Sequence, residues 1–346
     1  MDERIRSAVG EGPAWIVGGA IRDELLGRDV VDVDVACADP ELAARLYGRL
    51  EGGAVFPLSE RHGAWRVAFR TGRTVDFTPL RGETIEDDLR TRDFAANAVA
   101  RPVGSAELVD PLGGAGDVEA RRLRAVSERI FEDDPLRLLR AVRLEDELSF
   151  HLDEETERLL RASAGRVAEP AGERILGELE RLSPAGFRRL AELELLEPLG
   201  GSLERLEAVD LVDSPGFLLV TIFGENLRRY PVSNDLRRFA TTLLAAERPD
   251  DDSPRAIHRF RRRTEPWALS ALAFLGATDL YEPLRAARAA EPAEPLLRGD
   301  ELGLPPGPEV GRLLELVEEE RAAGAIGSRD EALALVEREK RRAGGA

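Results

Sequence analysis

The sequence is poor in the residues that form cross-links or bind soft metals. A single cysteine, Cys37, excludes a disulfide framework and a cysteine-based zinc site. The three histidines, His62, His151 and His258, lie far apart and lack the spacing of metal ligands. No run of about 18 apolar residues occurs, and the first residues contain no apolar signal segment. We therefore expect a soluble, cytoplasmic protein with no membrane partner.

Lysine is also scarce, since Lys340 is the only one. The 49 basic and 66 acidic side chains give a net charge of −17, which argues against a non-specific nucleic-acid binder. Almost all of the basic residues are arginines, however, and arginine binds phosphates with two parallel hydrogen bonds. Because these arginines cluster, local patches decide which partners the chain can bind.

The length of 346 residues predicts two or three domains, and the apolar periodicity divides the chain into an α/β part and a helical part. The predicted strands cover residues 14–17, 30–36, 65–69 and 74–78, and the first helices cover 20–26 and 40–49. Beyond residue 130 the spacing is helical to the end. We expect an α+β fold with a mixed-sheet head (1–125), a helical neck (126–195) and an elongated helical body and tail (196–346).

The strongest chemical signal is Asp32-Val33-Asp34 on a predicted strand. Residues i and i+2 of a strand point to the same face, so the two carboxylates project together. Two close negative charges are costly without a cation between them, and oxygen ligands suit Mg²⁺. Asp76 on another predicted strand is a candidate third ligand, and such a set can hold two metal ions for phosphoryl transfer. The alternative is that these aspartates lie on the wet face of an edge strand.

Gly18-Gly19 follows the first predicted strand and precedes a helix. Glycines let a phosphate approach the backbone, and the first helical N–H groups favour an anion. Arg22 can add a charge-assisted contact to the same phosphates. The alternative is an ordinary turn with an Arg22–Asp23 pair at the surface.

Together these features resemble a known family. The segment GGAIRDELLGRDVVDVDVA (18–36) resembles the head motif of the class II tRNA nucleotidyltransferase and bacterial poly(A) polymerase family, within the polymerase-β-type nucleotidyltransferases. The further matching motifs follow in order: EDDLRTRDFAANAVA (86–100), DPLGGAGDVEARRLRAV (110–126), FEDDPLRLLRAVRL (131–144), GERILGEL (172–179) and LLRGDELGLPPGPEVGRLLELV (296–317). The resemblance implies a polymerase-β-like head.

The match has departures and gaps. Thr91 replaces an arginine of the usual pair, Ala95 replaces a threonine, and Leu144 replaces a phenylalanine. Residues 201–295 match only in being helical.

The resemblance implies a role for each motif of the head. Asp32 and Asp34 are implied to be catalytic and to bind two Mg²⁺ ions. A second set is implied to contact the triphosphate and ribose of the incoming nucleotide: Gly18, Gly19, Arg22, Arg92 and Asn97. The alternatives are a salt bridge of Arg92 with Asp88 or Asp93, and a turn-stabilising role for Asn97.

The segment from Asp134 to Arg143 is implied to select the nucleotide. In the family an acid and an arginine of this helix, here Asp134 and Arg137, present a base-like edge to CTP or ATP. Arg140 and Arg143 would more naturally face phosphates. The alternative for Asp134 is a helix cap, with Pro135 in the first turn. Each step of three residues drifts by about 60°, so the four side chains cannot all reach one base.

Arginine clusters in the helical part are candidates for binding the tRNA acceptor arm: Arg228, Arg229, Arg259, Arg261 and Arg262. The alternative is a solvated helix face balanced by nearby acids such as 250–252.

The function that the resemblance implies is template-independent addition of C, and of A in some members, to the tRNA 3′ end from CTP and ATP. Family members that add the whole CCA usually carry a longer flexible loop where this chain has only residues 78–87. We therefore hold addition of CC alone and of CCA as equal hypotheses, and CC addition would require a separate A-adding enzyme.

Three other functions remain open from the sequence. They are a bacterial poly(A) polymerase, a non-catalytic RNA-binding protein with the same fold, and nucleotidyl transfer to a small molecule. The tail motif and the segment ERHGAWRVAF (60–69), which lacks a GRRF-like pattern, argue against a poly(A) polymerase.

Overall fold

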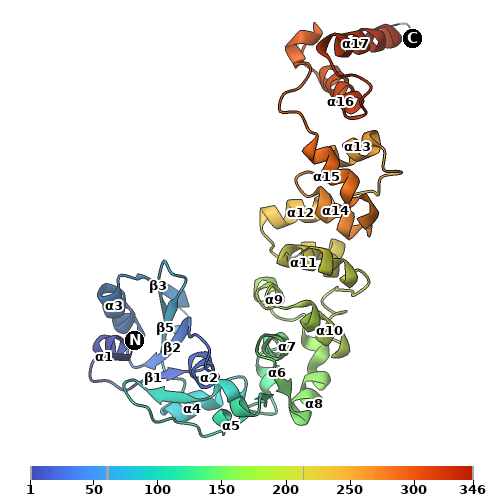
Figure 1. Ribbon diagram of the computed structural model, residues 1–346. Coiled ribbons are helices and arrows are strands. Elements are labelled where there is room, and N and C mark those ends of the chain that lie inside the picture. Colours follow the sequence, from blue (N-terminus) through green and yellow to red (C-terminus); the bar gives the residue numbers. More distant parts are fainter. Residues whose placement is uncertain (1, 60–61, 213, 345–346) are drawn as a thin grey trace. The chain divides into compact units, whose positions relative to one another are not determined.

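The computed structural model describes residues 2–59, 62–212 and 214–344. The first two residues of the ERHGAWRVAF segment therefore lie outside the described residues. The chain forms two compact units, Met1–Leu199 and Gly200–Ala346 (Figure 1). No helix in the described part combines the length and the apolar character needed to cross a membrane.

A six-stranded mixed sheet forms the head of the first unit, as predicted. Its strands are β1 (Ala14–Val17), β2 (Asp32–Cys37), β3 (Ala54–Ser59), β4 (Ala64–Ala68), β5 (Thr74–Thr78) and β6 (Ala100–Pro102). They lie in the order β3-β4-β5-β2-β1-β6, and β2 and β5 pair in parallel while the other neighbours are antiparallel. This pairing places β2, which carries Asp32 and Asp34, near the middle of the sheet.

One face of the sheet packs against helices, and the other face carries Asp32 and Asp34. On one face α1 (Asp2–Val9), α2 (Gly19–Leu25) and α3 (Pro40–Glu51) bury a core with the strands that includes Val33 and Val35. Because side chains alternate along a strand, Asp32, Asp34 and Ala36 project from the other face. There Ala36 packs in a smaller cluster with α4 (Ile85–Arg90). The residues next to Ala36 on this face of β2 are therefore the two aspartates.

The predicted neck belongs to the same compact unit as the head. The remaining helices of the unit are α5 (Gly114–Glu119), α6 (Ile130–Asp133), α7 (Leu136–Leu148), α8 (Glu154–Ser163), α9 (Gly172–Leu179) and α10 (Pro184–Glu192). A short parallel pair joins the two parts, since β7 (Arg122–Leu123) of the head pairs with β8 (His151–Leu152) of the neck. The unit ends at Leu199, close to the predicted end of the neck at residue 195.

The second unit is helical in its described residues, as expected. Its helices are α11 (Pro215–Phe223), α12 (Asn234–Leu244), α13 (Pro254–Thr264), α14 (Ala268–Phe274), α15 (Tyr281–Ala289), α16 (Pro308–Ala322) and α17 (Arg329–Gly344). Serine side chains cap α11, α12 and α13, and each accepts a hydrogen bond from a backbone N–H of the first turn. A small apolar cluster that includes Leu302, Leu313 and Val336 joins α16 and α17.

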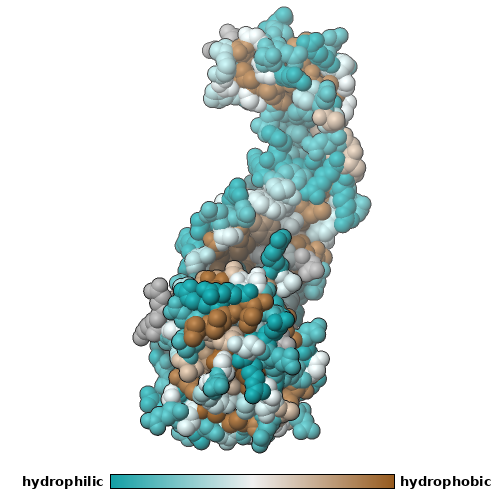
Figure 2. All heavy atoms as spheres, turned by 90° about the vertical axis from the view of Figure 1, so that its left-hand side faces the viewer, coloured by the Kyte–Doolittle hydropathy of each residue, from teal (hydrophilic) through white to brown (hydrophobic). Residues whose placement is uncertain are grey.

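The surface is mainly hydrophilic. Figure 2 shows the side on which α1, α3 and β3 lie, where apolar atoms interrupt the hydrophilic surface in places. Large exposed apolar side chains on these elements are Leu42, Leu50, Phe56 and Leu58.

Candidate active site

A cleft of about 310 Å³ opens in the first unit, lined by residues of both head and neck. It brings together most of the residues predicted for the catalytic and nucleotide site: Gly18, Gly19, Asp34, Arg92, Asn97, Asp134, Arg137 and Arg140. Residues 110 and more apart in the chain thus meet at one place, as the resemblance implied for one nucleotide site.

The carboxylate of Asp34 reaches the cleft from β2. Asp34 lies opposite Val17 of β1 and Asp76 of β5 in the sheet register. Burial raises the pKa of Asp34, although the charge of Arg92 opposes the rise. Asp32 lies two residues earlier at the more exposed end of β2, where it accepts a hydrogen bond of 2.7 Å from the hydroxyl of Thr74.

Asp76 does not behave as a free third ligand. Both of its carboxylate oxygens accept hydrogen bonds of 2.7 Å from the guanidinium of Arg66 on the neighbouring strand β4. Among the described residues, no group of three or more His, Cys, Asp or Glu side chains is arranged to hold a metal ion. The carboxylates that remain available for a metal are those of Asp32 and Asp34.

The glycine turn after β1 lines the cleft, and its backbone lies close to Arg92 and Asp34. Gly18 has φ +74° and ψ −134°, a conformation that side-chain-bearing residues rarely adopt. A Cβ atom at this position would lie 2.7 Å from a terminal nitrogen of Arg92 and 3.5 Å from a carboxylate oxygen of Asp34. Glycine is therefore required here for steric reasons as well as for its backbone conformation.

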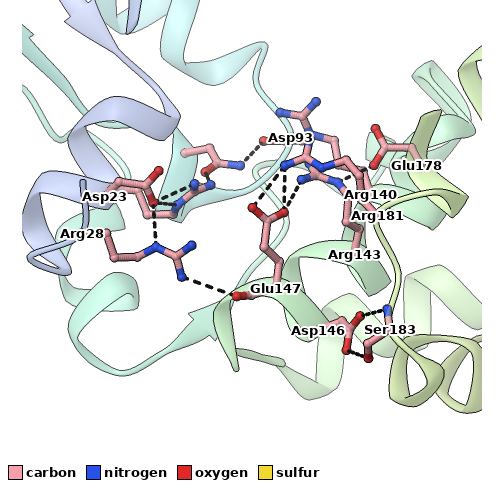
Figure 3. Close-up of polar contacts among 12 residues, drawn as sticks. Asp23, Arg28, Asp93, Arg140, Arg143, Asp146, Glu147, Glu178, Arg181 and Ser183 are labelled. Carbon is pink, nitrogen blue, oxygen red and sulfur yellow. Dashed lines mark hydrogen bonds and ion pairs between the residues drawn. The ribbon is translucent and has the colours of Figure 1, made fainter. Parts of the chain in front are cut away.

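Arg22 does not point into the cleft, which corrects the expected phosphate contact. Its guanidinium is buried and donates to the carboxylate of Asp23 at 2.8 and 3.0 Å and to the side-chain oxygen of Asn97 at 2.8 Å. The amide nitrogen of Asn97 in turn donates to Asp93 at 3.0 Å. Asp93 also pairs with Arg140 of the neck, and Figure 3 labels both residues. Arg22 and Asn97 thus hold Asp93, and the Asp93–Arg140 pair joins the head to the neck.

Arg92 forms an ion pair with Asp88, which was the alternative to a contact with the nucleotide. It also lines the cleft. Two of its nitrogens donate to one oxygen of the buried carboxylate of Asp88, at 2.9 and 3.1 Å. The other oxygen of Asp88 accepts the backbone N–H of Arg81 at 3.1 Å. The remaining terminal nitrogen of Arg92 is the atom that lies next to Gly18. Asp88 therefore fixes the position of Arg92 in the cleft.

At the neck end of the cleft, Asp134 stands one residue before the N-cap Pro135 of α7 and lines the cleft. Its carboxylate accepts the backbone N–H of Leu136 at 3.2 Å and pairs with Arg174 at 2.8 Å. Burial acts to raise the pKa of Asp134, but these hydrogen bonds and the positive charges of Arg174 and Arg137 outweigh it and lower the pKa. Asp134 is thus an ionised acceptor at neutral pH. The helix α7 begins at Leu136, one residue beyond the predicted first-turn position of Pro135.

Arg137 and Arg140 follow on the same side of α7. Arg137 donates to the backbone carbonyl of Thr91 at 2.8 Å. Arg140 forms an ion pair with the buried carboxylate of Asp93. Burial acts to raise the pKa of Asp93, but Arg140 and the hydrogen bonds to Asp93 prevail and lower it.

Arg143 lies outside the cleft, and the expectation that it faces phosphates is wrong. It is buried and pairs with Glu178 of α9 and with Glu147 at 2.6 Å. In Figure 3 dashed lines join the carboxylate of Glu147 to Arg143 and to Arg181. The nine residues from Asp134 to Arg143 turn a helix by about 180°, so the side that faces the cleft at the start faces the neck at the end.

The arginine clusters of the second unit are mostly paired with acids. On α13, Arg259 pairs with Glu319 of α16, and Arg262 lies 3.9 Å from Glu315 of the same helix. The ion-pair partners of these two arginines therefore come from α16, and Asp250 and Asp251 act on Arg259 through their charges. Arg261 is buried and pairs with Glu265 and Glu291, so it is a structural residue and not an exposed RNA contact.

The two remaining candidates are Arg228 and Arg229, which end the short 3₁₀ helix Gly224–Arg229. Arg228 is exposed, with only Glu225 nearby at 3.9 Å, and Arg229 lies close to Gly200. Of the five arginines suggested for RNA binding, Arg228 and Arg229 are exposed and are not part of the α13–α16 ion pairs.

Seven residues that line the cleft were not predicted as site residues: Thr78, Arg81, Asp88, Thr91, Asp93, Leu136 and Arg174. Asp88 and Arg174 stand within motifs that the sequence does carry, EDDLRTRDF and GERILGEL. Arg81 lies in the short connection between β5 and α4, and the sequence-based prediction used only the length of that connection. The motifs mark the segments, but the partner of each side chain emerges only from the fold.

Comparisons with known proteins identify relatives of this chain. The Poly A polymerase head domain family matches residues 14–124. An A-adding tRNA nucleotidyltransferase of Deinococcus radiodurans is 34% identical over an alignment that covers 94% of this chain and 95% of that protein. A CC-adding tRNA nucleotidyltransferase of Geobacter sulfurreducens is 44% identical over 172 residues, which cover 49% of this chain and 40% of that protein.

A solved structure shows the same fold over nearly the whole chain. The structure of a CCA-adding enzyme with CTP matches with a TM-score of 0.79 and 21% identity, covering 97% of this chain and 94% of that one. Fold, ordered motifs and full-length similarity coincide, and the chain belongs to the class II tRNA nucleotidyltransferase family.

Proposed function

We propose that this chain adds two C residues from CTP to the tRNA 3′ end, without a nucleic-acid template, and leaves the final A to a second enzyme. The observation that carries the proposal is the connection between β5 and α4, which spans only residues 79–84. The resemblance associates full CCA addition with a longer loop at this point. The 44% identity to a CC-adding relative over about half of this chain supports the same specificity.

Addition of A is the second candidate. The relative from Deinococcus radiodurans that aligns over almost the whole chain is an A-adding enzyme. The two candidates require the same fold and the same cleft, so they differ only in which base the cleft accepts.

The neck end of the cleft provides the chemistry for reading a base. The ionised carboxylate of Asp134 accepts hydrogen bonds, and Arg137 and Arg174 donate them. The pairing edge of cytosine offers an amino donor beside a ring-nitrogen acceptor, and that of adenine does the same. Uracil and guanine present a carbonyl oxygen at the position of the amino group, which the carboxylate would repel. This arrangement supports a choice of CTP or ATP over UTP and GTP.

Asp32 and Asp34 would hold Mg²⁺ at the other end of the cleft. They are oxygen donors on the same face of β2, and a divalent cation would favour the charged form of Asp34, which burial alone disfavours. The metal, when bound, supplies positive charge to the reacting phosphate and to the attacking 3′-hydroxyl. The chain's own part is to position: Gly18 leaves room beside Asp34, and Arg92, held by Asp88, offers a cation to the triphosphate.

The experiment uses a tRNA transcript that ends at the discriminator base. The purified chain with Mg²⁺ receives CTP, ATP or both, and product length is read at one-nucleotide resolution. We expect two added C residues whether or not ATP is present. Three added nucleotides would mean full CCA addition, and a long A tail would mean a poly(A) polymerase. No extension would exclude C addition and leave A addition or non-catalytic RNA binding.

A further inference from the structure

One arginine of the cleft, Arg81, has no acidic partner among the described residues. Three of its aspartates each have an arginine partner, in the pairs Asp88–Arg92, Asp93–Arg140 and Asp134–Arg174. Arg137 donates to backbone carbonyls. Arg81 lines the same cleft and is exposed, and its guanidinium has no hydrogen bond or ion pair with any residue that the structure describes.

The backbone of Arg81 is nevertheless held in place. Its N–H donates to Asp88 at 3.1 Å, and the other oxygen of that carboxylate holds Arg92. Three residues later, Thr84 and Asp87 form a reciprocal cap at the start of α4. The short connection is thus anchored at both Asp88 and the helix start, and it presents Arg81 from a defined position.

We infer that Arg81 binds the triphosphate of the incoming nucleotide, together with Arg92. This inference rests on the proposed function, and it names a further residue of its nucleotide site. A nucleoside triphosphate brings several negative charges into a cleft whose other cations are already partnered. An arginine that loses no internal ion pair can give its full set of donors to phosphate oxygens.

The position of Arg81 favours the nucleotide over the RNA as its partner. One buried carboxylate fixes both Arg81 and Arg92, and the free nitrogen of Arg92 lies next to Gly18 and near Asp34. Asp88 holds the backbone of Arg81 and the guanidinium of Arg92, so both arginines line one cleft and can contact one anion there. The short β5–α4 connection therefore also contributes a side chain, Arg81, that binds the nucleotide.

The test compares Arg81→Ala and Arg81→Lys with the wild-type chain, and Arg90→Ala is the matched control. Arg90 is an exposed arginine of the neighbouring helix, paired only with Asp87 at 3.7 Å, and it does not line the cleft. Loss of charge-assisted hydrogen bonds weakens binding by roughly 10- to 100-fold. We expect Arg81→Ala to raise both the Kd of CTP, measured calorimetrically without RNA, and the KM for CTP by this factor. Arg81→Lys should recover part of the loss, and Arg90→Ala should match the wild type.

Two probes separate the phosphate contact from other roles. Inorganic triphosphate should compete with CTP less well in Arg81→Ala, while binding of cytidine, which has no phosphate, should not change. An unchanged Kd for CTP would overturn the inference, as would an increase confined to the KM for tRNA, which would place Arg81 on the RNA. If the wild type binds CTP but extends no tRNA, the proposed function fails while the binding data still decide the role of Arg81.

Discussion

Arginines at this site have different roles because their surroundings differ. Arg22 is buried and holds Asn97 and Asp23, whereas Arg143 is buried among glutamates of the neck. Arg92 is partnered by Asp88 yet still faces the cleft. Residue type and motif therefore narrow the candidates, and the partners of each side chain decide which of them can bind a phosphate.

Asp34 is the residue on which transfer depends most directly in this account. We expect Asp34→Asn to reduce nucleotide incorporation by about 1,000-fold, since metal-assisted charge stabilisation is worth several kcal/mol. Because burial disfavours the charged form of Asp34, the amide should leave the Tm unchanged or raise it. The measurements are initial rates of C incorporation, binding of tRNA and thermal unfolding.

The matched control for this change is Asp29→Asn, an exposed residue in the turn before β2. It should retain wild-type activity and stability. Full incorporation by Asp34→Asn would contradict the assignment of Asp34 to the reacting centre.

At the scale of elements, the turn between β1 and α2 requires glycine for two separate reasons. We expect Gly18→Ala to lower stability by about 1–3 kcal/mol from backbone strain, and to displace Arg92, whose nitrogen lies 2.7 Å from the new Cβ. The KM for CTP should therefore rise as well. Gly52→Ala is the control, because Gly52 has φ +75° but nothing within 4 Å of its Cβ position. It should lose stability while the KM for CTP stays unchanged, and equal kinetic effects in the two variants would contradict this reading of the turn.

The two faces of α7 are separable by mutation. We expect Arg143→Ala to cost about 3 kcal/mol of unfolding free energy, because it leaves the glutamates of a buried ion pair without their partner. The KM for CTP should change less than about twofold, since Arg143 does not line the cleft. Arg158→Ala, which breaks a fully exposed pair with Glu155, should leave the unfolding free energy almost unchanged. A large rise in the KM for CTP in Arg143→Ala would return Arg143 to the nucleotide site.

The sequence predicted the elements that carry a clear apolar period and missed those that do not. The helix α3 and the strands β2 and β5 lie within a few residues of their predicted bounds. The strands β3 and β6 were not predicted, and both contain a proline, Pro57 and Pro102. Proline is tolerated in them because both are edge strands of the sheet. Edge position depends on the whole topology, which a local pattern does not reveal.

The candidate site was predictable to a similar degree. The aspartates of β2 and the glycine turn follow from local geometry, since side chains alternate on a strand and glycine allows φ above zero. The pairing of Arg66 with Asp76 joins neighbouring strands, and that of Arg174 with Asp134 joins residues 40 positions apart. Such pairings change which groups remain free, and both Asp76 and Arg22 have partners inside the protein.

At the scale of the whole molecule, the net charge of −17 conceals a local balance. The acids of α16 pair with the arginines of α13 in the second unit, while the cleft of the first unit keeps an unpartnered arginine. The cleft is therefore prepared for an anion although the chain as a whole is acidic. In the proposed function, the nucleotides added to the tRNA then depend on whether the cleft binds CTP or ATP after each addition.

The most direct measurement is the extension of two tRNA transcripts by the intact chain, one ending in C and one ending in CC. Both receive CTP and ATP with Mg²⁺ in parallel reactions, and incorporation is followed at one-nucleotide resolution. The account predicts that the C-ending tRNA gains one C, and that the CC-ending tRNA gains no A over the same time. Addition of A to the CC end at a comparable rate would contradict it and would show that the short β5–α4 connection does not exclude ATP.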